Sequence, residues 1–295
     1  MNFKKLGTIG IFLGMIILLC TACTKENKSN SKISIVSSTN VYADIAKNIV
    51  GKYGISSAII KSSSVDPHDF EPKTSDAKDL KHADIIIANG MDYDGWMKKL
   101  AKANGKKITR VGEDLMHLKT DANPHIWYNL KMPQAYVKYL VKRLSTLDKK
   151  HSAYYKNNAQ KYLKKIAKIQ KIANNIKAVK KPVLVSEPVF DYALIAAGYK
   201  IGNPEFEEAV EKETDPSPKI IKHMNKMIAT KKIAFFVNNT QVNSATINSF
   251  IKKAKANKIP ILKVRETIPN DTTYFDWMLT CLLYTSDAAD DVIDV

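Results

Sequence analysis

Cysteine is nearly absent from this 295-residue chain, and its three copies stand near the two ends, at Cys20, Cys23 and Cys281. The long stretch between them therefore contains no thiolate for a structural zinc site, no cysteine nucleophile and no disulfide. A folded domain in this stretch must take its stability from a hydrophobic core. Hydrophobic residues make up 45% of the chain, which is normal for a globular protein.

Arginine is also scarce. The chain has only Arg110, Arg143 and Arg265. Its basic residues are therefore mostly lysines: lysine and arginine together number 46, against 29 aspartates and glutamates, which gives a net charge of +17. Nucleic-acid recognition favours arginine forks interleaved with aromatic residues, so we expect no nucleic-acid partner. A lysine-rich surface is typical of an exported protein that faces anionic lipids or wall polymers. An ordinary solvated surface is the simpler alternative.

No hydrophobic run is long enough to span a bilayer comfortably as a permanent helix. The apolar run from Ile11 to Leu19 follows a short basic region, Lys4-Lys5, and precedes small residues. This pattern predicts a secretory signal over residues 1–22, followed by a polar, flexible tether over residues 23–32. A simple N-terminal membrane anchor is the alternative.

The signal ends in Thr21-Ala22-Cys23, which resembles the end of a bacterial lipobox. Cys20 stands where a lipobox usually has leucine, but the two small residues favour cleavage before Cys23. The resemblance implies that Cys23 becomes diacylated and tethers a soluble domain to the membrane. We therefore expect an extracytoplasmic protein that is lipid-anchored to the bacterial cell membrane.

The last fifteen residues, 281–295, differ in composition from the rest of the chain. They contain four aspartates and no lysine, so residues 1–280 alone carry a net charge of +21. The stretch from Cys281 to Asp290 resembles a translated sequencing-library adapter. We expect the natural sequence to end near Thr280 and the tail to interrupt a last helix that opens at Tyr274. A genuine acidic tail is the alternative.

Strand and helix patterns alternate over residues 33–144. Short apolar runs predict strands at 33–37, 58–60, 85–89 and 107–111. Amphipathic stretches predict helices at 41–50, 75–82, 96–103 and 133–147. Such alternation predicts an N-terminal α/β lobe with a parallel sheet that is covered on both faces.

A different pattern follows over residues 145–180. From Tyr155 onward apolar residues recur at helical spacing, at Ala159, Tyr162, Ile166, Ile169, Ile172 and Ile176. This spacing predicts one long amphipathic helix that ends near Val179, before Lys181-Pro182.

A second α/β lobe is predicted over residues 181–280. Its expected strands are 183–186, 233–237 and 261–264, and its expected helices are 189–197, 218–230 and 245–256. Ser217 and Pro218 suit the cap and the first turn of the second of these helices. The fold class is thus α/β, with two lobes joined by one long rigid helix.

Two of the six histidines follow proline in distinctive motifs. One is Asp66-Pro67-His68-Asp69-Phe70-Glu71-Pro72, and the other is Asn123-Pro124-His125-Ile126-Trp127. Proline restricts the neighbouring backbone and holds each ring on a stiff loop, which suits a metal ligand. Neutral imidazole is a good donor for Zn²⁺ and other first-row ions. We expect the remaining histidines to be solvated: His82, His117, His151 and His223.

These two motifs, together with Ser186-Glu187-Pro188, resemble those of the zinc/manganese solute-binding lipoproteins, the cluster A-I or TroA-like family. The resemblance runs from about Ile33 to Leu279, with the motifs in the family's order. It implies an ion clamped in the cleft between two lobes. It also implies Mn²⁺ or Zn²⁺ as the transported ligand, an ABC-transporter membrane permease as partner, and no enzymatic activity. We further expect a monomer.

The resemblance also implies a ligand set of His68, His125, Glu187 and Glu266. Zinc-preferring members often have histidine at the place of Glu187, and manganese-preferring members often have glutamate. Glu266 stands where the family usually has aspartate, and a surface ion pair is its alternative role. The chain lacks the long His/Asp-rich loop of many zinc-specific members, which favours manganese or mixed use.

Physical chemistry supports this set independently of the resemblance. Two imidazoles and two carboxylates give a mixed N/O site whose charge balances a divalent cation. Ligands split between two lobes couple binding to closure of the lobes, a signal that an importer can recognise.

Two other functions compete with transport. A metal-dependent hydrolase would also use histidine and carboxylate ligands, but it keeps an open position for water. The chain has no His-Glu-x-x-His motif and no evident general base beside the ligands. A surface adhesin is the third possibility, and its cell binding would survive loss of His68 and His125.

Overall fold

The computed structural model describes residues 32–62, 65, 67, 70–242 and 244–293, with side chains up to Ser286. From Ile33 onward the chain forms one compact unit. Four predicted features lie outside the described residues: the signal segment, the tether up to residue 31, the lipidation site at Cys23, and His68.

The first sheet has four parallel strands in the order β2-β1-β3-β4, which confirms the expected α/β pattern. All four residues of β3, Ile85–Ala88, are buried, because helices cover both faces of the sheet. On one face Ile35 and Ile87 pack with helix α2, and on the other Ile86 packs with α3 and α4. The other elements of this part are β1 (Ile33–Thr39), α2 (Asn40–Val50), η1 (Gly51–Tyr53), β2 (Gly54–Ile60), α3 (Thr74–Lys81), α4 (Gly95–Ala103), β4 (Thr109–Arg110), η2 (Val111–Leu115) and η3 (Ile126–Tyr128).

The second sheet has three parallel strands in the order β5-β6-β7. Two of its helices begin at serine caps, since Ser217 and Ser244 accept hydrogen bonds from the backbone N–H three residues later. The elements are β5 (Leu184–Val185), η5 (Pro188–Phe190), α7 (Asp191–Ala196), α8 (Pro204–Glu211), α9 (Pro218–Ala229), β6 (Phe236–Asn239), α10 (Ala245–Ala256) and β7 (Ile261–Val264).

Two details of this second part differ from the sequence prediction. Helix α8 was not predicted from the sequence. Strand β6 begins at Phe236 rather than at residue 233, although Ile233, Ala234 and Phe235 are all buried. The apolar run therefore predicted the buried residues correctly and the start of the strand incorrectly.

The long helix α6 (Ser152–Asn175) contacts α2 and α5 (Met132–Leu147) of the first part and α7 of the second, with η4 (Lys149–His151) before it. Its predicted end near Val179 is wrong by four residues. Asparagine is a weak helix former, and the helix stops at the pair Asn174-Asn175. Ile176 then adopts an extended backbone, and its side chain still packs on the core. The apolar period thus continues beyond the helix.

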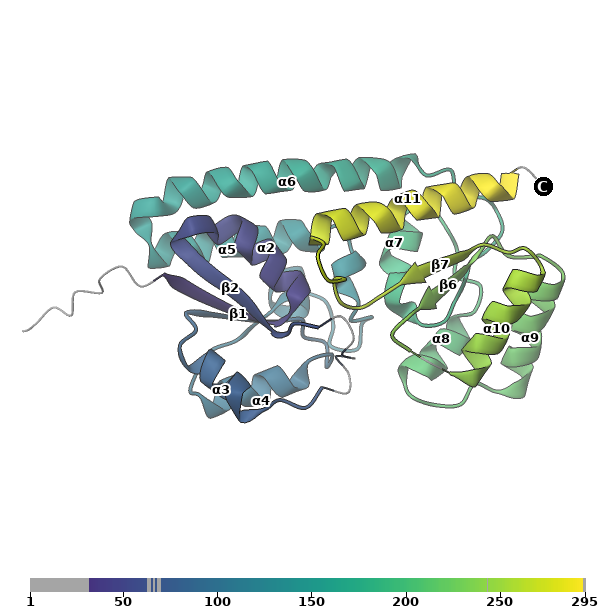
Figure 1. The fold of residues 1–295 in the computed structure, drawn as a ribbon, viewed down its shortest axis with the longest axis horizontal. Helices are drawn as coiled ribbons and strands as arrows, with labels where there is room; N and C mark the ends of the chain where they lie inside the picture. The colour runs from purple at the N-terminus through teal and green to yellow at the C-terminus, as the bar shows by residue number, and fades with distance from the viewer. Residues whose placement is uncertain (1–31, 63–64, 66, 68–69, 243, 294–295) are drawn as a thin grey trace, which may run out of the picture. The chain divides into compact units, whose positions relative to one another are not determined.

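The last helix, α11 (Tyr274–Ile293), lies beside α6 in Figure 1 and contacts it. The expectation that the tail interrupts this helix near Cys281 is wrong. Cys281, Leu282 and Thr285 are buried at helical spacing, whereas Leu283 and Tyr284 are exposed. The tail continues the helix because Cys281 and Leu282 fall on its inner face and the tail contains no glycine or proline.

One large hydrophobic core extends through both sheets and the helices between them. Tyr128 lies near its middle, with ring centroids 4.7 Å from Phe190 and 5.2 Å from Trp277. These three aromatic residues come from η3, η5 and α11, so they join three distant parts of the chain. The long-range packing of large rings stabilises the arrangement of the two sheets.

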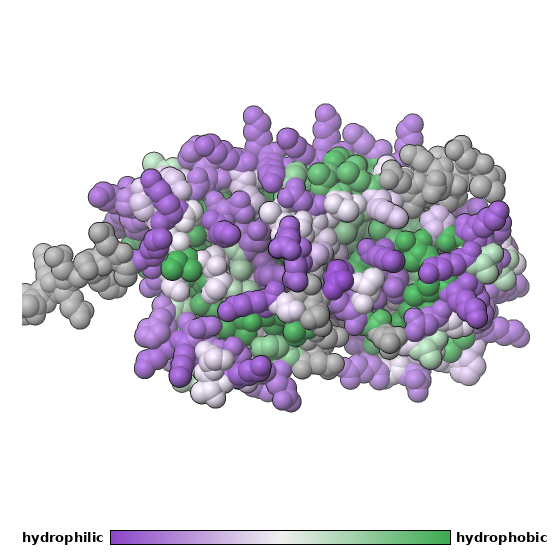
Figure 2. Space-filling model, in the orientation of Figure 1, coloured by the Kyte–Doolittle hydropathy of each residue, from purple (hydrophilic) through white to green (hydrophobic). Residues whose placement is uncertain are grey.

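Hydrophilic residues cover much of the face shown in Figure 2, with hydrophobic residues between them. Among the residues that the structure describes, no helix is both long and apolar enough to cross a membrane. The one described cysteine, Cys281, is a free thiol.

The adjacent leucines of α11 provide a test of its packing. We expect Leu282→Ala to lower the free energy of unfolding by about 2–5 kcal/mol, because the side chain is fully buried. The matched variant Leu283→Ala, at a position 46% exposed, should change it by less than about 0.5 kcal/mol. Chemical denaturation measures both. Equal effects of the two variants would contradict the packing of this helix.

Candidate functional site

Two carboxylates meet at the carboxyl-terminal edge of the second sheet. Glu187 follows β5, Asn239 ends β6 and Glu266 follows β7. The three parallel strands end at one edge, which is where α/β sheets place their binding groups. The Asn239 amide nitrogen donates to Glu187 Oε2 at 2.7 Å and to Glu266 Oε1 at 2.9 Å.

These carboxylate oxygens lie close together in a buried setting. Since the two hydrogen-bond lengths add to 5.6 Å, the oxygens are no farther apart than that. Glu187 is 9% exposed and Glu266 only 2%. Buried carboxylates are unfavourable unless hydrogen bonds or a cation compensate them, so this pair is a strong candidate for cation binding. The burial of Glu266 argues against its alternative role in a surface ion pair.

Asn239 is itself fixed by two residues, Ser186 just after β5 and Gln241 just after β6. Its backbone N–H donates to Ser186 Oγ at 2.9 Å, and its Oδ1 accepts from the backbone N–H of Gln241 at 3.1 Å. The second bond also sets the orientation of the side-chain amide, because it identifies Oδ1 as the acceptor. The NH₂ group must then face the two carboxylates.

The imidazole of His125 is held on the first-lobe side. His125 is 1% exposed, and its Nδ1 lies 2.8 Å from Asn123 Oδ1, which also accepts from the His125 backbone N–H at 2.9 Å. An amide oxygen can only accept, so Nδ1 carries the proton and Nε2 keeps the lone pair. A fixed tautomer of this kind is typical of a metal-ligating histidine.

Asn123 also contacts the second lobe. Its Nδ2 donates to the carbonyl of Pro188, next to Glu187, at 2.7 Å. Tyr192 Oη donates to the carbonyl of Asn123 at 2.9 Å. The loop that carries His125 is therefore bonded to the segment that carries Glu187.

Tyr93 connects His125 with Glu266. Its hydroxyl donates to Glu266 Oε2 at 3.1 Å, and its ring centroid lies 6.3 Å from the His125 ring and 5.0 Å from that of Trp127. Burial, followed by the negative charge of Glu266, raises the pKa of Tyr93 well above its usual value. The phenol therefore stays protonated and remains a hydrogen-bond donor.

A strained turn after β3 positions Tyr93. Gly90, Met91 and Asp92 have φ angles of 87°, 54° and 59°, a left-handed backbone that non-glycine residues rarely adopt. The carboxylate of Asp94 accepts from the backbone N–H groups of Asn89 at 2.6 Å and Gly90 at 3.0 Å. These two bonds compensate the strain and hold the turn.

The structure brings three of the four predicted ligands to one region, and the fourth, His68, lies outside the described residues. Within the described part of the chain, no three His, Cys, Asp or Glu side chains are close enough together to hold a metal ion. The four-ligand set is therefore still a prediction. Sequence reasoning missed Tyr93 and Gln241. Their position after the strands β3 and β6 is the signal that could have indicated them.

This arrangement defines a class, the extracytoplasmic solute-binding proteins, in which polar groups of two α/β lobes face one binding region. The chain belongs to the family described as zinc-uptake complex component A, periplasmic, whose model matches residues 35–282. The members of this family are solute-binding components of importers and not enzymes, so the hydrolase alternative is excluded.

Several curated relatives are similar over most of their length. The chain is 30% identical over 254 residues to the metal ABC transporter substrate-binding lipoprotein SloC of Streptococcus mutans, covering 77% of this chain and 82% of the relative. It is 32% identical over 260 residues to the manganese ABC transporter substrate-binding lipoprotein PsaA of Streptococcus anginosus, covering 80% of this chain and 82% of the relative.

Solved structures confirm the fold. The solute-binding protein FpvC of Pseudomonas aeruginosa, in complex with Mn²⁺, superposes with a TM-score of 0.72 at 18% identity, covering 89% of this chain and 100% of that one. A Cd-bound periplasmic metal-binding protein of Candidatus Liberibacter asiaticus gives a TM-score of 0.69 at 20% identity, with coverages of 88% and 100%.

An acidic cavity of about 700 Å³ adjoins the region that contains His125, Glu187 and Glu266. Its lining includes Tyr93, Asn123, Pro188, Asp191 and Glu207. The carboxyl groups of Asp191 and Glu207, in the first turns of α7 and α8, are joined by a hydrogen bond. Burial raises the pKa of Asp191 to about 7, and burial together with Asp191 raises that of Glu207 to about 9.

This pair predicts a pH-dependent stability. Because both pKa values lie above the ordinary values of 3.8 and 4.5, the folded state holds protons that the unfolded chain releases. The pair's contribution to stability is therefore full below about pH 4 and is lost as the pH rises toward about 9. We expect Glu207→Gln to raise the free energy of unfolding at pH 8.5 by about 1–2 kcal/mol and to have little effect at pH 4.

Chemical denaturation at both pH values measures this difference. The control is Glu208→Gln, the exposed neighbour on α8 that pairs with Lys212, which should show no such pH-dependent gain. A gain for Glu207→Gln that is equal at the two pH values would contradict the prediction.

Proposed function

We propose that this protein captures Mn²⁺ or Zn²⁺ on the outer face of the cell membrane and delivers the ion to the permease of an ABC importer. The observation that carries the proposal is the meeting of Glu187 and Glu266 at one amide nitrogen, with Tyr93 linking this pair to His125. Family membership and the named metal-transport lipoproteins among the relatives support it.

The proposed ligands are His68 and His125 from the first lobe and Glu187 and Glu266 from the second. Such a set has two neutral nitrogens and two negative carboxylates, so it neutralises a divalent cation. It contains no thiolate, which suits Mn²⁺ as well as Zn²⁺. The fixed Nε2 of His125 and the converging carboxylates support the three described members. We further propose that the protein acts as a monomer.

Substitution of the ligands should abolish tight binding. We expect the purified chain to bind one equivalent of Mn²⁺ or Zn²⁺ in calorimetric titration. His125→Ala, Glu187→Ala and Glu266→Ala should each lower the affinity more than about 100-fold, since loss of an outer hydrogen-bond partner alone costs about 10–100-fold. His223→Ala, at an exposed position on α9, is the matched control and should bind like the unchanged chain. Absence of tight binding by the unchanged chain would overturn the proposed function.

The proposed lipid anchor has its own test. We expect Cys23→Ala to release the protein from the membrane fraction into the medium, because the residue that carries the acyl chains is lost. Cys20→Ala removes the neighbouring cysteine and should leave the protein on the membrane. Cell fractionation and immunoblotting measure the distribution. Release by Cys20→Ala instead would move the lipidation site to Cys20.

A further inference from the structure

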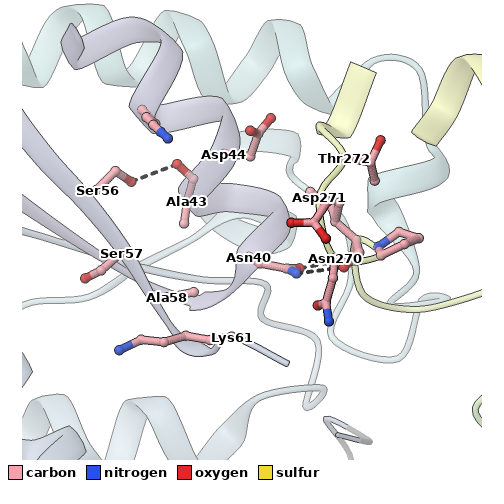
Figure 3. Close-up of a pocket in the computed structure, with 13 residues that line it drawn as sticks. Asn40, Ala43, Asp44, Ser56, Ser57, Ala58, Lys61, Asn270, Asp271 and Thr272 are labelled. Carbon is pink, nitrogen blue, oxygen red and sulfur yellow. Dashed lines mark hydrogen bonds between the residues drawn. The ribbon is translucent and has the colours of Figure 1, made fainter. Parts of the chain in front are cut away.

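Elements of both lobes hold the segment that contains Glu266. Tyr128 Oη of the first part donates to the carbonyl of Arg265 at 2.9 Å. Asn40, at the start of α2, bonds both backbone groups of Ile268: its Nδ2 donates to the carbonyl at 2.9 Å, and its Oδ1 accepts from the N–H at 3.1 Å. Figure 3 shows Asn40 at the wall of a cavity of about 600 Å³, beside this segment.

The side chain of Gln241 bonds the same segment at Glu266 itself. Gln241 Oε1 accepts from the Glu266 backbone N–H at 2.6 Å. It also accepts from the backbone N–H of Thr267 at 3.3 Å and from the Thr267 hydroxyl at 3.4 Å. These bonds fix the backbone from which the Glu266 carboxylate extends, whereas Asn40 acts two residues later.

The other end of the same carboxamide bonds the first lobe. Gln241 Nε2 donates to the carbonyl of Val65 at 3.2 Å. Val65 belongs to the connection between β2 and α3, and in the sequence it stands three residues before His68. A single side chain therefore bonds to the two segments that contain one proposed ligand from each lobe.

The backbone of Gln241 is itself held in place by a hydrogen bond. Its own backbone N–H donates to Asn239 Oδ1 at 3.1 Å, and the Asn239 amide bonds Glu187 and Glu266. The five hydrogen bonds of Gln241 thus involve its backbone N–H, its side-chain oxygen and its side-chain nitrogen. A side chain held at so many points has few alternative rotamers. It can therefore fix the position of one segment relative to the other.

We propose that Gln241 is a positioning residue for cation binding, which holds the Glu266 segment of the second lobe in register with Val65 of the first. The inference rests on the proposed function. Holding donors in place before the ion arrives reduces the ordering cost of binding, so loss of the bridge should weaken affinity without removing a ligand.

Two variants separate the two halves of the bridge. Gln241→Met keeps the length of the side chain and removes both functions. Gln241→Glu keeps an acceptor for the Glu266 N–H but loses the donor to Val65. Gln160→Glu, at an exposed position on α6, is the charge-matched control.

The probe is Mn²⁺ alone, and its binding is measured by calorimetric titration. Hydrogen–deuterium exchange of residues 61–72 and 264–270 is measured with and without Mn²⁺.

We expect both Gln241 variants to lower the Mn²⁺ affinity about tenfold or more, with the melting temperature without Mn²⁺ nearly unchanged. Gln241→Met should lose exchange protection in both segments. Gln241→Glu should keep protection in 264–270 and lose it in 61–72, a selective rescue that a merely structural role does not give.

Two results would overturn the inference. One is Mn²⁺ affinity within twofold of the unchanged chain for both variants. The other is an affinity loss that comes only with a lower melting temperature and faster exchange throughout the protein. Failure of the proposed function is a different result, since the unchanged chain and the Gln160→Glu control would then bind neither Mn²⁺ nor Zn²⁺.

Discussion

The amide group of Asn239 donates to two buried carboxylates at once, and the arrangement of the whole site depends on this pair of hydrogen bonds. Two carboxylates so close together in a buried place repel each other and lose hydration. The NH₂ group of asparagine has two N–H bonds, one for each acceptor. The arrangement requires β5, β6 and β7 to run in the same direction, so that Glu187, Asn239 and Glu266 come to one edge of the sheet, and their parallel pairing provides this.

Much of the fold could be predicted from the sequence, because its strongest signals are local. The isoleucine run of β3 and the cap and proline at Ser217-Pro218 each define an element within a few residues. The end of α6 and the course of α11 could not be predicted in the same way. At Ile176 the core continues to bury apolar side chains after the helix has stopped, and in α11 the tail supplies the right spacing by its own residues. Packing decides both outcomes.

In the candidate site, too, some residues are indicated by local sequence signals and others only by the folded chain. His125 and Glu187 stand in short motifs with proline beside them, so the sequence alone indicates them. Tyr93 and Glu266 are 173 residues apart, and Gln241 and Val65 are 176 residues apart. No periodicity or motif relates such pairs. Only the folded chain shows that a tyrosine and a glutamine hold the glutamate whose identity departs from the family's usual aspartate.

The hydroxyl of Tyr93 and the amide of Asn239 have a consequence for release of the cargo. Both groups donate to the oxygens of Glu266 that the proposed function assigns to the ion. A cation bound at this carboxylate would share its two oxygens with two neutral donors of the protein, since each oxygen has two lone pairs. The same donors remain at the oxygens when the ion leaves, so the empty carboxylate is never left uncompensated. A carrier built in this way can release its ion without unfolding its site.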